Sequence, residues 1–165
     1  MQKHLIIFIK NPEIGTVKTR LAASIGDKKA LEVYKDLMEK CRLESQATNA
    51  KRHLFYSSEI TENDNWNSSH FEKEVQVNGD LGDKISEAFK HVFKEGGKVI
   101  VIGSDCYDLS SDIMEEAFQK LDNSDVVVGP ANDGGYYLLG IKKFHSQLFS
   151  NINWSTETVL NETVE

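Results

Sequence analysis

Two carboxylates follow a short apolar run at residues 99–102. The run consists of β-branched residues, and Asp105 and Asp108 come after it, three residues apart. A short apolar run bounded by turn residues predicts a strand that is buried on both faces. Open α/β sheets bind ligands at the carboxyl ends of such strands, and carboxylate oxygens suit Mg²⁺ or Mn²⁺ bridging a diphosphate. The sequence therefore predicts a divalent-metal site at Asp105 and Asp108, with a cap on the following helix as the alternative role for Asp108.

A loop with three cations follows the first apolar run, at residues 5–9. Lys10, Lys18 and Arg20 carry the charges, and Gly15 and Thr19 lie among them. Backbone amides, a helix amino terminus, and Lys and Arg side chains all bind phosphate. The loop has neither the Walker pattern nor the G-x-G-x-x-G dinucleotide pattern. We expect a nucleotide or sugar-phosphate site here, with a solvated basic turn as the alternative.

A polar turn with two consecutive glycines separates two further apolar runs, at 125–129 and 136–141. Asp133 in this turn is expected to orient a sugar hydroxyl, act as a base or bind metal. Gly134 and Gly135 permit positive φ and the close approach of a ligand to the backbone. Tyr136 and the tyrosine after it point to opposite faces of a strand, so one of them can contact a ligand. The alternative is a tight connector in which Asp133 only stabilises the turn.

Three further positions have two interpretations each. Asp80 follows an Asn-Gly turn, and it either contacts a base or ribose or caps the helix that starts there. Trp154 either walls an acceptor pocket or packs at the edge of the core. Ser155 is expected to cap a short helix, and its other role comes from the resemblance described below.

The predicted elements alternate between strands and helices along the chain. Strands are expected at 4–10, 53–57, 74–77, 99–102, 125–129 and 136–141. Helices are expected at 18–25, 27–47, 83–94 and 113–121, with one or two short helices in 145–165. This alternation predicts a single-domain α/β fold of the Rossmann-like kind, with a mostly parallel, doubly wound sheet in three α/β/α layers.

Composition excludes several classes of protein. The net charge is −7 and the pI is near 5.3, which argues against a nucleic-acid partner, since such proteins carry a basic face. No apolar run approaches the roughly 20 residues of a membrane span. The start lacks the features of a signal peptide, so we expect a cytoplasmic protein with no membrane partner. Cys41 and Cys106 lie far apart and predict reduced thiols. The histidines are scattered without zinc spacing and are expected at the surface or at strand edges.

Five segments together are similar to one known family. In order along the chain they are KNPEIGTVKTRLA, QVNGDLGDKISEAF, GSDCYDLSSDIMEEAF, VVVGPANDGGYYLLGI and LFSNINWSTETVL. They resemble the radical-SAM/selenodomain-associated glycosyltransferase-like family. That family belongs to the nucleotide-diphospho-sugar transferase superfamily and has the A-type glycosyltransferase fold. The resemblance runs from Leu5 to Thr163, which is nearly the whole chain.

The resemblance implies roles for the candidate residues. It implies that Lys18 and Arg20 hold phosphates and that Asp105 binds the metal. It also implies that the segment from Asp133 to Gly135 lies in the acceptor or catalytic region. Trp154 and Ser155 fall on the W-S-T segment of the family, which we take as a further substrate contact.

The chain departs from the family pattern at two places. Tyr107 stands where the family usually has proline. The sequence stops at Glu165, before the family's usual final strand and its late acidic segment. We therefore expect one domain over residues 1–165 that lacks this last segment, together with any metal ligand that the segment supplies in the family.

Three functions are compatible with these residues. The first is metal-assisted transfer of a glycosyl group from a nucleotide-diphosphate sugar to a small-molecule acceptor. Lys18 and Arg20 would then stabilise the leaving nucleoside diphosphate, and Asp133 would position or deprotonate the acceptor hydroxyl. The second is nucleotidyl transfer from an NTP to a phosphorylated small molecule, with release of pyrophosphate. The third is a degenerate module that binds nucleotides without turnover.

Overall fold

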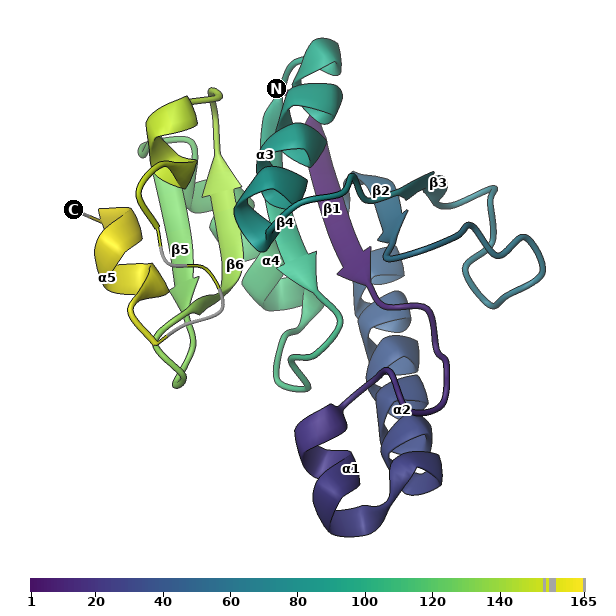
Figure 1. Cartoon of the computed structure of the whole chain (residues 1–165). Coiled ribbons are helices and arrows are strands. Elements are labelled where there is room, and N and C mark those ends of the chain that lie inside the picture. Colours follow the sequence, from purple (N-terminus) through teal and green to yellow (C-terminus); the bar gives the residue numbers. More distant parts are fainter. Residues whose placement is uncertain (153, 155–156, 165) are drawn as a thin grey trace.

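A six-stranded sheet runs through the centre of the molecule (Figure 1). The computed structural model describes residues 1–152, 154 and 157–164. The strands are β1 (Lys3–Ile9), β2 (Lys51–Tyr56), β3 (Glu72–Val75), β4 (Lys98–Gly103), β5 (Val126–Pro130) and β6 (Tyr136–Ile141). Their order across the sheet is β3-β2-β1-β4-β6-β5. β1 to β4 are parallel, and β6 runs antiparallel to both of its neighbours, β4 and β5. The predicted mostly parallel sheet is confirmed.

Helices cover both faces of this sheet and complete three layers (Figure 1). They are α1 (Thr19–Ile25), α2 (Asp27–Ala47), α3 (Leu81–Val92), η1 (Phe93–Glu95), α4 (Ser111–Lys120), η2 (Ser146–Phe149) and α5 (Val159–Val164). Successive residues of a strand point to opposite faces, so β1 contributes to two buried clusters. On one face Leu5 packs in a cluster with Met114 of α4. On the other face Ile6 packs in a cluster with Phe89 of α3.

The loops that follow β1 and β4 leave the sheet side by side. The two strands are hydrogen-bonded neighbours, and Phe8 lies opposite Gly103 in their register. One step further, Ser104 N donates to Phe8 O at 3.2 Å. α1 and the first turns of α2 project beyond this edge of the sheet, and no residue of α1 is buried (Figure 1). The topology therefore brings the cation-bearing loop and the first carboxylate to one place.

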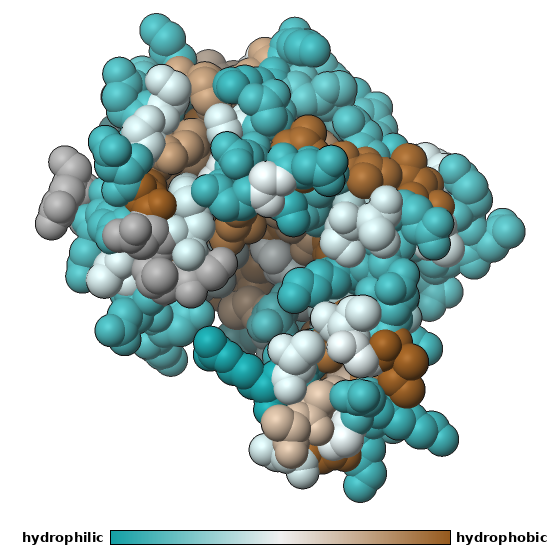
Figure 2. Space-filling model, viewed as in Figure 1, coloured by the Kyte–Doolittle hydropathy of each residue, from teal (hydrophilic) through white to brown (hydrophobic). Residues whose placement is uncertain are grey.

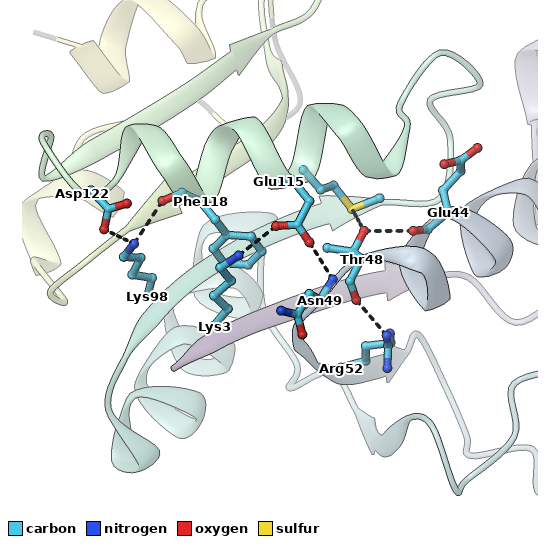
Figure 3. A network of polar contacts seen from close by, with 10 residues as sticks. Lys3, Glu44, Thr48, Asn49, Arg52, Lys98, Glu115, Phe118 and Asp122 are labelled. Carbon is cyan, nitrogen blue, oxygen red and sulfur yellow. Dashed lines mark hydrogen bonds and ion pairs between the residues drawn. The ribbon is translucent and has the colours of Figure 1, made fainter. Parts of the chain in front are cut away.

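A network of polar contacts lies at the opposite end of the strands, where β1 and β4 begin (Figure 3). Glu115 of α4 accepts from Lys3 Nζ at 2.8 Å and from Asn49 N at 2.6 Å. Lys98 Nζ donates to Phe118 O at 3.2 Å and pairs with Asp122. These contacts fix α4 against the amino-terminal ends of β1 and β4, and against the turn between α2 and β2.

Most predicted elements agree with the observed ones within two residues, but three details differ. β3 lies at Glu72–Val75, two residues before the predicted 74–77, which is among the largest shifts, because its polar sequence has no apolar alternation to mark the start. Ser110 caps α4 by accepting from Ile113 N at 3.3 Å, so the cap proposed for Asp108 is supplied by another residue. The prediction that the histidines lie at the surface or at strand edges is wrong for His4 and His53, which are completely buried on the interior strands β1 and β2 with their rings in contact.

Among the described helices, none combines the length and the apolar character that crossing a membrane requires.

Candidate functional site

The first loop and the first carboxylate after β4 are in direct contact. Lys18 Nζ lies 2.6 Å from Asp105 Oδ1. Lys18 has a left-handed backbone conformation with φ 50°, which a residue other than glycine seldom adopts, and it directly precedes α1. The Lys18 side chain is 24% exposed and that of Asp105 is 63% exposed. The ion pair therefore joins the two loops while most of the Asp105 carboxylate stays open to a ligand.

A cleft of about 900 Å³ opens beside this ion pair. The face shown in Figure 2 is hollowed between α1 and the sheet. We call this space the cationic cleft, because four cations line it: Lys10, Lys18, Arg20 and Lys84. Thr19, Ser57 and Gln76 add polar side chains to its wall. α1 has 7 residues, so the positive charge of the cleft comes from side chains and does not depend on the amino terminus of a long helix.

A second cavity, of about 440 Å³, shares Gly103 and Asp105 with the cationic cleft. We call it the acidic pocket, because it is lined by the three carboxylates of Asp105, Asp108 and Asp133. Among the described residues that line it, none is Lys, Arg or His. Asp105 belongs to both cavities, and it therefore marks the boundary between a cationic and an anionic space.

The hydroxyl of Tyr34 holds the floor of the site together. Tyr34 is buried on α2, and its hydroxyl accepts from Lys10 N at 2.7 Å. The same oxygen is 3.0 Å from Lys10 O and 3.1 Å from Ser104 Oγ. Burial raises the pKa of this phenol, so it stays protonated and can donate. Tyr34 thus connects α2 to the ends of β1 and β4, one residue before Asp105. In the sequence, only the polar tip of a tyrosine on the apolar face of the predicted helix at 27–47 could have indicated this role.

Two amide side chains bind backbone groups around the cationic cleft: Gln76 lies in its wall, and Asn11 contacts the backbone next to the lining residue Ser57. Asn11 Nδ2 donates to Glu59 O at 2.8 Å, and Asn11 Oδ1 accepts from Ser58 N at 3.0 Å. Gln76 Nε2 donates to Ile9 O at 3.1 Å and to Phe55 O at 3.0 Å. Neither amide could be assigned this role from sequence, because the partners are backbone groups of distant strands and loops.

The side chain of Asp133 helps to hold the turn in which it lies. Asp133 Oδ1 accepts from Gly135 N at 3.0 Å, as in the alternative that the sequence left open. Asp133 also lines the acidic pocket and a neighbouring cavity that contains Arg20, Tyr136 and Trp154. The residue therefore has a structural contact and a position beside the candidate site.

Gly134 has the positive φ that the sequence analysis allowed for, and it is also packed closely against the protein's own chain. Its φ is +86°, and a Cβ there would lie 1.7 Å from Glu157 O. Leu160 N donates to Gly134 O at 2.8 Å. The close approach seen in the structure is made by the protein's own carboxyl-terminal segment, which gives Gly134 a packing role; contact with a ligand stays a prediction.

Asp80, Gly15 and Trp154 lie outside the cationic cleft and the acidic pocket. Asp80 accepts from Asp83 N at 2.8 Å in a capping box of α3, and it does not line either cavity. Gly15 adopts φ 81° in its turn and also lies outside both cavities. Trp154 packs at the edge of the core and crosses the ring of Tyr136 at 6.4 Å. Ser155 lies outside the described residues.

The acidic pocket has donors that suit a hard divalent ion. In the described part of the chain, its carboxylates do not bring three ligand oxygens within 4.8 Å of one another. Mg²⁺ is commonly held by one or two carboxylates together with substrate phosphates and water. Asp105 and Asp108, beside a cleft lined by four cations, therefore fit Mg²⁺ or Mn²⁺ bound together with a diphosphate.

One family model matches most of the chain. The family is described as an uncharacterized protein conserved in bacteria (DUF2064), and the match covers residues 41–156. Among proteins with curated functions, none matches the sequence.

Several solved structures have the same fold as this chain. A protein from Desulfovibrio desulfuricans G20, provisionally named a nucleotide-diphospho-sugar transferase, is 30% identical with a TM-score of 0.89. That match covers 99% of this chain and 74% of the other. A 4-diphosphocytidyl-2C-methyl-D-erythritol synthase is 11% identical with a TM-score of 0.53, over 89% of this chain and 76% of the other. The synthase from Anaerococcus prevotii DSM 20548 is 11% identical with a TM-score of 0.57, over 99% and 82%. The two synthases share the fold alone with this chain.

Proposed function

The chain belongs to the DUF2064 family, and we propose that it transfers a glycosyl group from a nucleotide-diphosphate sugar to a small-molecule acceptor with the help of a divalent metal. The observation that carries the proposal is the position of Asp105 between the cationic cleft and the acidic pocket. The relative from D. desulfuricans supports it through its name and its 30% identity.

The cationic cleft is the donor side in this proposal. When the bond between the sugar and the diphosphate breaks, negative charge grows on the leaving nucleoside diphosphate. Lys18 and Arg20 hold that diphosphate and stabilise the growing charge, because fixed cations need no reorganisation at the moment of reaction. A divalent ion on Asp105 and Asp108 supplies additional charge neutralisation when bound.

The acidic pocket is the acceptor side. Asp133 orients the acceptor hydroxyl and accepts its proton as the oxygen attacks the sugar. Tyr136 and Tyr137 also line the pocket and offer it aromatic surface.

The charge of the acidic pocket favours glycosyl transfer over nucleotidyl transfer. A phosphorylated second substrate would place its phosphate beside Asp133, the pocket carboxylate that binds no metal in this proposal, with no Lys or Arg among the described lining residues. Two like charges 4 Å apart repel by about 4 kcal/mol at the effective dielectric constant typical of a protein surface. An uncharged hydroxyl-bearing acceptor meets no such repulsion.

Analysis of the released product tests the proposal. The protein is incubated with nucleotide-diphosphate sugars, uncharged hydroxyl acceptors and Mn²⁺ or Mg²⁺, and free nucleoside diphosphate is measured. A parallel reaction contains NTPs and sugar phosphates, and pyrophosphate is measured. We expect nucleoside diphosphate in the first reaction and no pyrophosphate in the second. Pyrophosphate release would replace the proposal by nucleotidyl transfer. Binding of nucleotide with neither product would indicate a binding module.

A further inference from the structure

A second group of ligand atoms lies away from the cationic cleft, near the amino-terminal ends of β2 and β3. It consists of His53 on β2, Glu72 on β3 and Glu95 on η1, whose ligand atoms all lie within 4.8 Å of one another. His53 and Glu72 are paired in the register of β2 and β3. Three elements that are distant in sequence therefore converge on one point, which no spacing in the sequence indicates.

The imidazole of His53 is aimed into this group from a completely buried position. Its side chain is 0% exposed, and Nδ1 has no hydrogen-bond partner. Nδ1 lies 3.3 Å from Glu72 Oε2. A buried polar atom without a partner is costly, so the direction of this nitrogen calls for an explanation.

His4 on β1 contacts the second ring nitrogen of His53, the nitrogen that would not bind the metal. His4 Nδ1 lies 3.0 Å from His53 Nε2. Two neutral imidazoles share one proton across such a contact. In the tautomer in which His53 Nε2–H donates to His4, the lone pair of His53 Nδ1 faces a carboxylate oxygen, and a metal cation between them makes this contact attractive; in the other tautomer Nδ1–H faces Glu72. Histidines that bind metal commonly donate their other ring N–H to an acceptor in this way.

The spacing agrees with a common coordination geometry. Ligand atoms at bonds of about 2.0–2.1 Å in a tetrahedral zinc site lie roughly 3.3 Å apart. The distance from His53 Nδ1 to Glu72 Oε2 is 3.3 Å. One imidazole nitrogen with two carboxylates also suits Zn²⁺ better than Mg²⁺, which prefers oxygen ligands alone.

Lys51 shows that the two carboxylates are arranged around a positive charge. Its Nζ lies 2.8 Å from Glu72 Oε1 and 2.8 Å from Glu95 Oε2. Lys51 is 33% exposed and has a flexible stem that can turn into solvent. Its ammonium therefore competes with any metal for the same carboxylates.

We propose that His53, Glu72 and Glu95 bind a Zn²⁺-type ion in exchange for the ammonium of Lys51, and that the ion fastens the edge strand β3 and η1 to β2. This site is separate from the Mg²⁺ or Mn²⁺ position at Asp105, and it stands whether or not the proposed transfer reaction is correct.

The test measures Zn²⁺ affinity and stoichiometry on the full chain after treatment with a chelator, by competition with a fluorescent zinc indicator. We expect one Zn²⁺ per chain. His53→Gln and Glu95→Gln should each weaken its binding at least tenfold. Glu95 is exposed, so Glu95→Gln remains informative even where the buried His53→Gln variant folds poorly. Lys51→Met should tighten binding several-fold, because it removes the competing ammonium.

His91→Gln is the matched control. His91 Nε2 lies 2.8 Å from Glu74 Oε1 on the exposed side of α3, so this pair offers the same ligand types outside the proposed site. The control should leave affinity unchanged. Absence of Zn²⁺ binding in both the natural chain and Lys51→Met would overturn the proposal. Binding that survives Glu95→Gln, or that is weakened only by His91→Gln, would also overturn it.

Discussion

Replacing Tyr34 with phenylalanine separates a role in the site from a role in the core. The change keeps the ring and removes the oxygen that lies 2.7 Å from Lys10 N, 3.0 Å from Lys10 O and 3.1 Å from Ser104 Oγ. Leaving a buried partner unsatisfied costs about 1–3 kcal/mol. Ser104 is buried, whereas the exposed Lys10 can recover part of the loss from water. We therefore expect the free energy of unfolding to fall by about 2 kcal/mol.

The same change should also weaken ligand binding. The lost contacts join α2 to the strand ends that precede the first loop and Asp105. Their loss lets the two sides of the cationic cleft move apart. We expect the affinity for a nucleoside diphosphate, measured by isothermal titration calorimetry, to fall about tenfold, which corresponds to roughly 1.4 kcal/mol. Urea unfolding at unchanged m measures the stability.

Tyr56→Phe is the control for this experiment. Tyr56 is equally buried, and its hydroxyl contacts Asp64 and Thr61 O, in the loop after β2. Its removal should cost similar stability and leave nucleotide affinity unchanged. If Tyr34→Phe loses stability but binds the diphosphate as the natural protein does, Tyr34 is a core residue and the reasoning about the floor of the site is refuted.

Two other predictions concern stability. Gly134→Ala should destabilise more than Gly26→Ala: both positions have positive φ, but a Cβ at 134 meets Glu157 O, whereas one at 26 meets nothing within 4 Å. Equal losses in urea unfolding would contradict the packing role of Gly134. Burial lowers the pKa of His53 to about 4, below its ordinary value, so the unfolded chain binds more protons between about pH 6.5 and 4. Stability should therefore fall as the pH is lowered through this window, by up to about 3 kcal/mol from this residue, and His53→Gln should remove that part. Identical pH profiles with chelator present would count against a buried neutral His53.

The position of Asp105 at the end of a buried strand can be predicted from the sequence, but the side chains that surround it cannot. An apolar run that ends in Gly103 predicts a buried strand, and parallel topology then brings its end beside the loop after β1. α2 begins at Asp27 as predicted, because Gly26 interrupts the preceding helix.

Other features depend on contacts that a single sequence does not display. The pairing of His4 with His53 requires the parallel register of β1 and β2, which sets Ile6 opposite His53. The partners of Tyr34 are the main chain of Lys10 and the hydroxyl of Ser104, and both are distant in sequence. The packing of the carboxyl-terminal segment on Gly134 joins two parts of the chain that no local pattern connects.

The most direct measurement of the central claim is the metal response of nucleotide binding in Asp105→Asn. Its ion pair with Lys18 is exposed on the Asp105 side and should contribute no more than about 1 kcal/mol to stability, so the variant should fold. Calorimetric titration with a nucleoside diphosphate is carried out with and without Mn²⁺. We predict that Mn²⁺ raises the affinity of the natural chain at least tenfold and leaves the variant unaffected. The variant's metal-free affinity should be unchanged or higher, because Lys18 is released for the phosphates. A variant that keeps the full response to Mn²⁺ would contradict the assignment of Asp105 as the metal-binding boundary between the two cavities.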